Sequence, residues 1–111
     1  MATETTLVNQ IVKAIRAEHP SAWTLKVHGG GYQTVGVPDL ILCVDGLFIG
    51  LEVKRPRAGE SLDHARGRAT PGQLAQIHAI GRAGGRASVV ISVDEALAAV
   101  ESALARTEEV R

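Results

Sequence analysis

The sequence predicts a small α/β protein in which a mixed β-sheet is flanked by helices. Three observations predict this class: helical apolar spacing near both ends of the chain, short β-rich runs between them, and glycines where the runs stop. The expected element order is α-β-β-β-α-β-α. The chain has 111 residues, the length of a single domain, which we place at residues 1–111.

The first helix and strand follow from apolar spacing in the first quarter of the chain. Residues 5–18 carry apolar side chains at helical spacing, and Pro20 cannot continue that helix. Residues 23–28 then alternate apolar and polar side chains, as a half-buried strand does. Three glycines open a loop expected over residues 29–37.

A β-hairpin is expected next. Residues 39–44 and 47–54 are β-rich and flank Asp45-Gly46, and an Asp-Gly pair favours a type I′ turn because both central residues need positive φ. Cys43 alternates with apolar neighbours, so we expect it to pack in the core. As the single cysteine of the chain, it also fits a reducing compartment and a cytoplasmic location.

The second half of the chain contains two expected helices around one strand. Residues 55–69 are polar and basic, and we expect them to be irregular. The motif Thr70-Pro71-Gly72-Gln73 combines a capping box with proline at the first helical position, so a helix should begin there and end at a pair of glycines. Residues 87–92 form a β-branched strand, and Asp94 should cap a last helix that ends at about Arg106.

The composition excludes several classes of protein. Hydrophobic residues make up 45% of the chain and charged residues 22%, which is typical of a folded domain. No apolar run approaches the roughly 18 residues of a membrane span, and residues 1–6 lack the features of a secretory signal. The net charge is zero, but residues 53–86 carry seven Lys or Arg and two acidic residues, a net of +5. An anionic partner would therefore meet this middle third.

Two carboxylates and an ammonium group are predicted to converge on the hairpin. Strand alternation places Glu52 and Lys54 on one face, and the hairpin brings Asp39 alongside Glu52. Carboxylates suit Mg²⁺ or Mn²⁺, which polarise a phosphodiester and activate water, while Lys54 would orient that water or stabilise the growing charge. The alternative is a solvated strand face, but the basic segment that follows favours the functional interpretation.

These residues carry a resemblance to a known family. The stretches Gly36–Leu40, Phe48–Pro56 and Thr70–Gln73, in this order, resemble the VRR-NUC branch of the PD-(D/E)XK nuclease superfamily. The likeness runs from about residue 4 to residue 100. It implies a restriction-endonuclease-like core and metal-dependent cleavage of DNA, and small stand-alone members resemble junction-resolving enzymes that work as homodimers.

The resemblance also implies roles for individual residues. Asp39 and Glu52 would hold the metal together with the backbone carbonyl of Val53. Lys54 would be the catalytic lysine, and Gln73 the active-site glutamine carried by a helix.

A further metal ligand is implied on the first helix, where Glu4 matches best and Glu18, at the far end, fits less well. Both helix-borne candidates have ordinary alternatives. Glu4 would also favour the positive end of its helix without any metal. Gln73 would also complete a capping box with Thr70.

The predicted function is that of a Mg²⁺- or Mn²⁺-dependent DNA endonuclease that selects branched or junction DNA by its structure. Beside such a site, phosphate contact is the favoured role for four arginines in a segment expected to be mobile without DNA: Arg55, Arg57, Arg66 and Arg68. The alternative is a non-catalytic nucleic-acid-binding module that retains the fold. A structural or partner-binding domain would leave the grouping of carboxylates and lysine unexplained.

Overall fold

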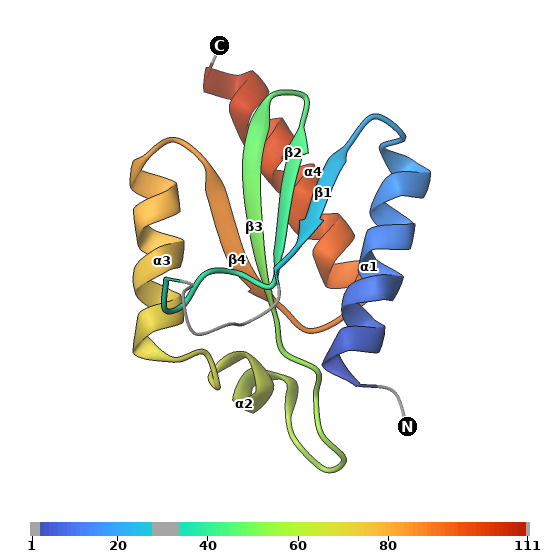
Figure 1. Cartoon of the computed structure of the whole chain (residues 1–111), viewed down its shortest axis with the longest axis vertical. Helices are drawn as coiled ribbons and strands as arrows, with labels where there is room; N and C mark the ends of the chain where they lie inside the picture. The colour runs from blue at the N-terminus through green and yellow to red at the C-terminus, as the bar shows by residue number, and fades with distance from the viewer. Residues whose placement is uncertain (1–2, 28–33, 111) are drawn as a thin grey trace.

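A four-stranded sheet with helices on both faces forms the molecule (Figure 1). The computed structural model describes residues 3–27 and 34–110, so the glycines expected to open the first loop lie outside the described residues. The elements in chain order are α1 (Glu4–Glu18), β1 (Trp23–Lys26), β2 (Leu40–Val44), β3 (Leu47–Val53), α2 (Leu62–Arg66), α3 (Pro71–Arg82), β4 (Arg86–Val90) and α4 (Val93–Val110). The predicted order is confirmed, with α2 added.

The sheet is mixed, as predicted. Its strands lie in the order β1-β2-β3-β4; β1 and β2 are antiparallel, as are β2 and β3, and β4 runs parallel to β3. The β2–β3 turn has positive φ at Asp45 (51°) and Gly46 (79°), which is the type I′ geometry expected for this pair. The turn sets the register, in which Leu40 lies opposite Leu51.

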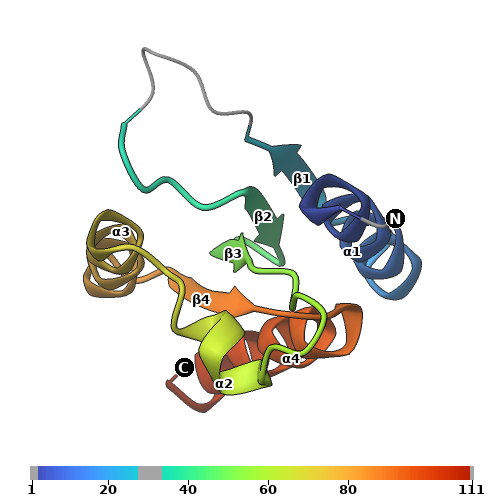
Figure 2. The same cartoon turned by 90° about the horizontal axis from the view of Figure 1, so that it is seen from below.

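The hydrophobic core lies between the sheet and the pair α1 and α4. Figure 2 shows these two helices along one side of the sheet and α3 on the other side, where it packs on β3 and β4. Alternating residues of β2 and β3 enter the core with Ile11 and Ile15 of α1 and Val100 of α4. The opposite face of β3 carries Glu52, so the strand alternation that builds the core also points this carboxylate toward α3.

Helix α2 corrects the expectation of an irregular basic segment. The Ser61 hydroxyl accepts the His64 N–H at 3.1 Å, and Ala65 is fully buried. Apolar periodicity predicts a helix only over a window of about 11 residues or more. Helix α2 has five residues and buries one alanine, so the sequence pattern does not reveal it.

The last helix begins earlier and ends later than predicted. The Ser92 hydroxyl, not Asp94, accepts the Glu95 N–H at 3.1 Å, and α4 extends to Val110 instead of ending near Arg106. Two cap-forming residues, Ser92 and Asp94, lie two positions apart, which made the start ambiguous from sequence. None of the helices in the described part of the chain combines the length and apolar character needed to cross a membrane.

Candidate functional site

The strand register brings the two predicted metal-binding carboxylates together. Leu40 pairs with Leu51, so Asp39, just before β2, lies across from Glu52 on β3. The Asp39 Oδ2 atom accepts the Val53 N–H at 2.8 Å, and the Asp39 carbonyl accepts the Val27 N–H at 2.8 Å. Asp39 is therefore held between β1 and β3 at the point where its side chain faces Glu52.

Glycines allow the segment before Asp39 to fit between β3 and the start of α3. Gly36 has φ of 85°, and a Cβ at this position would overlap the Gly72 carbonyl. A Cβ on Gly50 would lie 2.9 Å from Pro38 Cγ. The glycine and proline of the predicted motif thus serve close packing, which fixes Asp39 relative to both β3 and α3.

Glu52 is the one buried charged residue among those described, with 2% of its surface exposed. Its Oε1 atom accepts a hydrogen bond from the Gln73 side-chain amide and lies 3.9 Å from Lys54 Nζ. Among the residues that the structure describes, its Oε2 atom finds no hydrogen-bond partner. Burial and the nearby Asp39 carboxylate raise the pKa of Glu52 to about 7, and Lys54 opposes this shift.

The donor set fits a hard divalent cation. A buried carboxylate oxygen without a partner is costly, and a second carboxylate beside it raises the cost. A divalent ion would satisfy the free Oε2 and neutralise both groups with the oxygen ligands that Mg²⁺ and Mn²⁺ prefer. Asp39 and Glu52 are the residues that would hold it. Val53 contacts the site through its N–H, which donates to Asp39. A role for its carbonyl as a metal ligand stays a prediction.

Glu4 lies at the same end of the sheet as Asp39. The two residues line one pocket of about 140 Å³, together with Asn9 and Lys26, whose side chains are joined by a 3.0 Å hydrogen bond. Glu18 stands 14 residues further along α1, which corresponds to about 21 Å of helix. The arrangement therefore favours Glu4 over Glu18 as a third acidic group, and it adds Lys26, which the sequence analysis missed.

Gln73 combines the two roles that the sequence left as alternatives. Its Oε1 atom accepts the Thr70 N–H at 2.9 Å, and its backbone N–H donates to the Thr70 hydroxyl at 3.2 Å, which completes the capping box. Its Nε2 atom donates to Glu52. The cap uses the amide oxygen and so directs the amide nitrogen at the carboxylate.

Two of the four predicted DNA-binding arginines are held by acidic side chains. Arg68 binds Glu60 through Nε at 2.8 Å and also donates to the Arg55 carbonyl at 2.7 Å. Hydrogen bonds from Arg68 are the main reason that the pKa of Glu60 is lowered to about 2. The Arg68 guanidinium also lies 3.9 Å from the Glu4 carboxylate.

Arg66 is held in the same way. It makes two hydrogen bonds to Glu95 on α4, at 2.7 and 3.2 Å, and one to Asp63 at 3.0 Å. Arg55 is half-buried and Arg57 exposed, and neither side chain joins an ion pair within the described residues. The structure thus separates arginines that hold the segment from arginines that are open to a partner.

Two solved structures are similar to this chain over most of its length. One, titled "VRR_NUC domain", is 20% identical with a TM-score of 0.55, and the alignment covers 84% of this chain and 92% of that one. The other, a "VRR_NUC domain protein", is 18% identical with a TM-score of 0.55 and 88% coverage of both chains. The chain has the VRR_NUC fold. No family model matches the sequence, and no curated protein matches it either.

The VRR_NUC fold confirms the mixed α/β architecture that the sequence motifs predicted. Within this fold, the structure gathers Asp39, Glu52, Lys54 and Gln73 at one site, with Glu4 at its edge. The roles of these residues in chemistry remain predictions.

Proposed function

We propose that this chain is a DNA endonuclease that depends on Mg²⁺ or Mn²⁺. The observation that carries the proposal is the buried Glu52 carboxylate, which lies beside Asp39 and Lys54 and has one oxygen without a partner in the described part of the chain. Burying such a group lowers the stability of the fold unless a cation binds the carboxylate. The VRR_NUC fold supports a nuclease assignment.

The residues of the site have distinct roles in this proposal. Asp39 and Glu52 would hold the metal, and Glu4 extends the acidic surface toward α1. The ion, when bound, would lower the pKa of a water molecule and polarise the phosphodiester. Lys54 stabilises negative charge on the phosphate as water attacks phosphorus and the bond to the leaving oxygen breaks. Gln73 orients the Glu52 carboxylate.

We propose branched or junction DNA as the substrate, acted on by a homodimer. Residues 3–27 and 34–110 present no evident base-reading element, which favours recognition of shape and backbone. A row of exposed side chains crosses β1, β2 and β3 on the part of the sheet that α3 does not cover. In this row Trp23 lies opposite Cys43, and Cys43 lies opposite Phe48. Cys43 is exposed, which corrects its predicted place in the core. A second copy of the chain that covers this row would give a dimer with two metal centres, one for each of two DNA strands.

The test uses Glu52→Gln, with Asp45→Asn in the distant hairpin turn as a matched carboxylate-to-amide control. Glu52→Gln should remove divalent-ion binding, measured calorimetrically with Ca²⁺, and cleavage of branched and linear DNAs with Mg²⁺ or Mn²⁺. Asp45→Asn should leave both unchanged. Metal-dependent cleavage by Glu52→Gln at the wild-type rate would refute the proposed site. DNA binding without metal binding in the wild-type protein would identify a non-catalytic binding module.

A further inference from the structure

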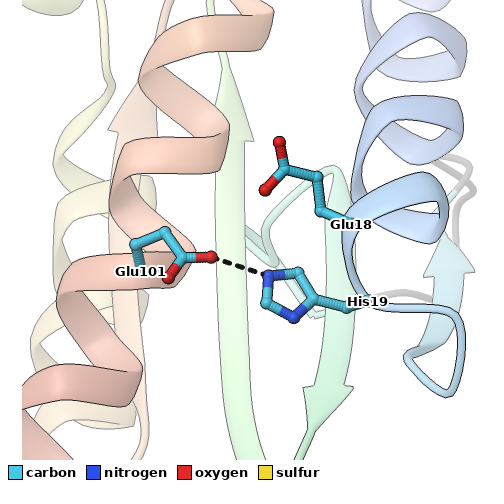
Figure 3. A group of neighbouring side chains, drawn as sticks. All are labelled: Glu18, His19 and Glu101. Carbon is cyan, nitrogen blue, oxygen red and sulfur yellow. Dashed lines mark hydrogen bonds and ion pairs between the residues drawn. The ribbon is translucent and has the colours of Figure 1, made fainter.

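A second group of metal-binding side chains lies where α1 ends against α4. Figure 3 shows Glu18 and His19 extending from the end of α1 toward Glu101 of α4. One donor atom from each residue lies within 4.8 Å of the other two. The His19 Nε2 atom is 2.9 Å from Glu101 Oε1. This group contains a nitrogen donor, unlike the all-oxygen carboxylate pair at Asp39 and Glu52.

The backbone of His19 is held in place by hydrogen bonds, and its imidazole is largely buried. His19 is the C-cap of α1, where its N–H donates to the Ile15 carbonyl at 2.7 Å and its carbonyl accepts the Ala22 N–H at 2.9 Å. Its side chain is only 17% exposed, whereas that of Glu101 is 59% exposed. A rigid nitrogen donor therefore faces two carboxylates that have room to adjust.

The charge of the group is not balanced by neighbouring basic residues. Within the described part of the chain, neither Glu18 nor Glu101 forms an ion pair with a lysine or arginine. Arg16, in the last turn of α1, donates instead to the Thr24 hydroxyl at 2.6 Å. Two carboxylates thus converge on one imidazole, an arrangement that a cation would stabilise.

We propose that Glu18, His19 and Glu101 form a zinc site that joins α1 to α4. Zinc binds imidazole nitrogen and carboxylate oxygen at about 2.0–2.2 Å, and three protein ligands leave a fourth position for water. Small rotations of the exposed glutamates would bring their oxygens to these distances. Imidazole disfavours Mg²⁺, so the two sites of the chain would select different metals.

The zinc site is independent of the proposed nuclease centre. Glu4, at the edge of that centre, stands 14 residues before Glu18 on the same helix, a separation of about 21 Å. Zinc bound at the far end of α1 would hold the helix against α4, on which it packs. Because the site needs the folded arrangement of both helices, zinc should raise the melting temperature in a concentration-dependent way.

The experiment uses the tag-free chain of residues 1–111 carrying Asp39→Asn and Glu52→Gln, so that the proposed nuclease centre contributes little to metal binding. Zn²⁺ is titrated in competition with a chromophoric chelator, and thermal unfolding is followed with and without Zn²⁺. We expect one zinc per chain and a rise in melting temperature. Adding His19→Ala should weaken binding by about tenfold or more and remove the thermal shift. Adding His78→Ala, an exposed histidine on α3, should change neither.

Because His19 is also the C-cap of α1, His19→Ala could lower stability without any effect on zinc, and Glu101→Gln controls for this. The amide still offers a hydrogen-bond partner to His19 but is a poorer metal ligand, so zinc affinity should fall while zinc-free stability stays near that of the parent. Co²⁺ should give a visible spectrum of nitrogen and oxygen ligation that is lost in both variants. Zinc affinity unchanged in His19→Ala and Glu101→Gln, or no zinc bound at millimolar concentration, would overturn the proposal.

Discussion

Replacing Gln73 by alanine tests whether its side-chain amide serves the site or only the helix. The amide oxygen accepts the Thr70 N–H, and the amide nitrogen donates to Glu52. Gln73→Ala removes both interactions. Thr70→Ala removes the other half of the capping box and leaves the Gln73 amide facing Glu52. Comparing the two variants therefore separates helix capping from a role in the site.

The expected magnitudes differ for stability and for cleavage. Loss of a cap costs about 1 kcal/mol, so Thr70→Ala should melt roughly 4–8 °C below wild type, and Gln73→Ala lower still because it also loses the bond to Glu52. Only Gln73→Ala leaves the buried Glu52 carboxylate without its hydrogen bond on Oε1. A hydrogen bond to a charged group contributes about 1.5–3 kcal/mol, and about 1.4 kcal/mol corresponds to tenfold in rate. Cleavage by Gln73→Ala should therefore fall about 10- to 100-fold.

The assay is single-turnover cleavage with protein in excess at saturating Mg²⁺, at a temperature where circular dichroism shows both variants folded. Thr70→Ala should cleave at nearly the wild-type rate. Equal losses of cleavage in the two variants would show that Gln73 acts only through the helix start. Wild-type cleavage by Gln73→Ala would show that the hydrogen bond to Glu52 has no part in the reaction.

Three further predictions concern charge at the site. Lys54→Ala should slow cleavage strongly and leave most of the DNA affinity, since its ammonium acts at one phosphate; parallel losses of binding and rate would make Lys54 a docking residue. In EDTA, the free energy of unfolding should fall as pH rises from about 4.5 to about 7, because the pKa of Glu52 is raised to about 7 and only the folded state keeps its proton in that range. Urea titrations should show this slope reduced in Glu52→Gln, and an equal slope in both proteins would contradict the assignment. Changing Arg55 and Arg57 together to Ala should flatten the dependence of log affinity on log salt by about 1 to 2 units in anisotropy titrations, and an unchanged slope would remove them from the DNA surface.

Local chemistry made much of the fold predictable. Asp45-Gly46 specified the hairpin turn, and the turn specified the register that places Asp39 across from Glu52. The Thr70–Gln73 motif likewise specified the start of α3. These signals act over a few residues, so a single sequence carries them in full.

The contacts that the sequence did not reveal join residues far apart in the chain. The close approach of Gly36 to Gly72 spans 36 positions, and the Arg66–Glu95 pair spans 29. Neither has a periodic signature. The double use of Gln73 was also hidden, because its bond to Glu52 depends on where α3 docks on the sheet.

The ion pairs of Arg66 and Arg68 reduce the positive charge that the basic segment can offer to a partner. The sequence gives residues 53–86 a net of +5, which suggests a continuous positive surface. Arg66 and Arg68 are engaged by Asp63, Glu95 and Glu60, and so contribute little free charge. Arg55 and Arg57, which follow β3, join no ion pair within the described residues, whereas Lys54 between them and the strand is paired with Glu52 at 3.9 Å.

This arrangement ties cations that would attract a phosphate to the end of β3, the strand that carries Glu52. Arg68 donates to the Arg55 carbonyl, one residue after Lys54, and its ion pair with Glu60 anchors it. Arg68, which is engaged by Glu60, therefore holds the backbone at Arg55, whose own side chain joins no ion pair within the described residues. A phosphate drawn to Arg55 and Arg57 would arrive beside Lys54 and the buried Glu52, where the proposed chemistry occurs.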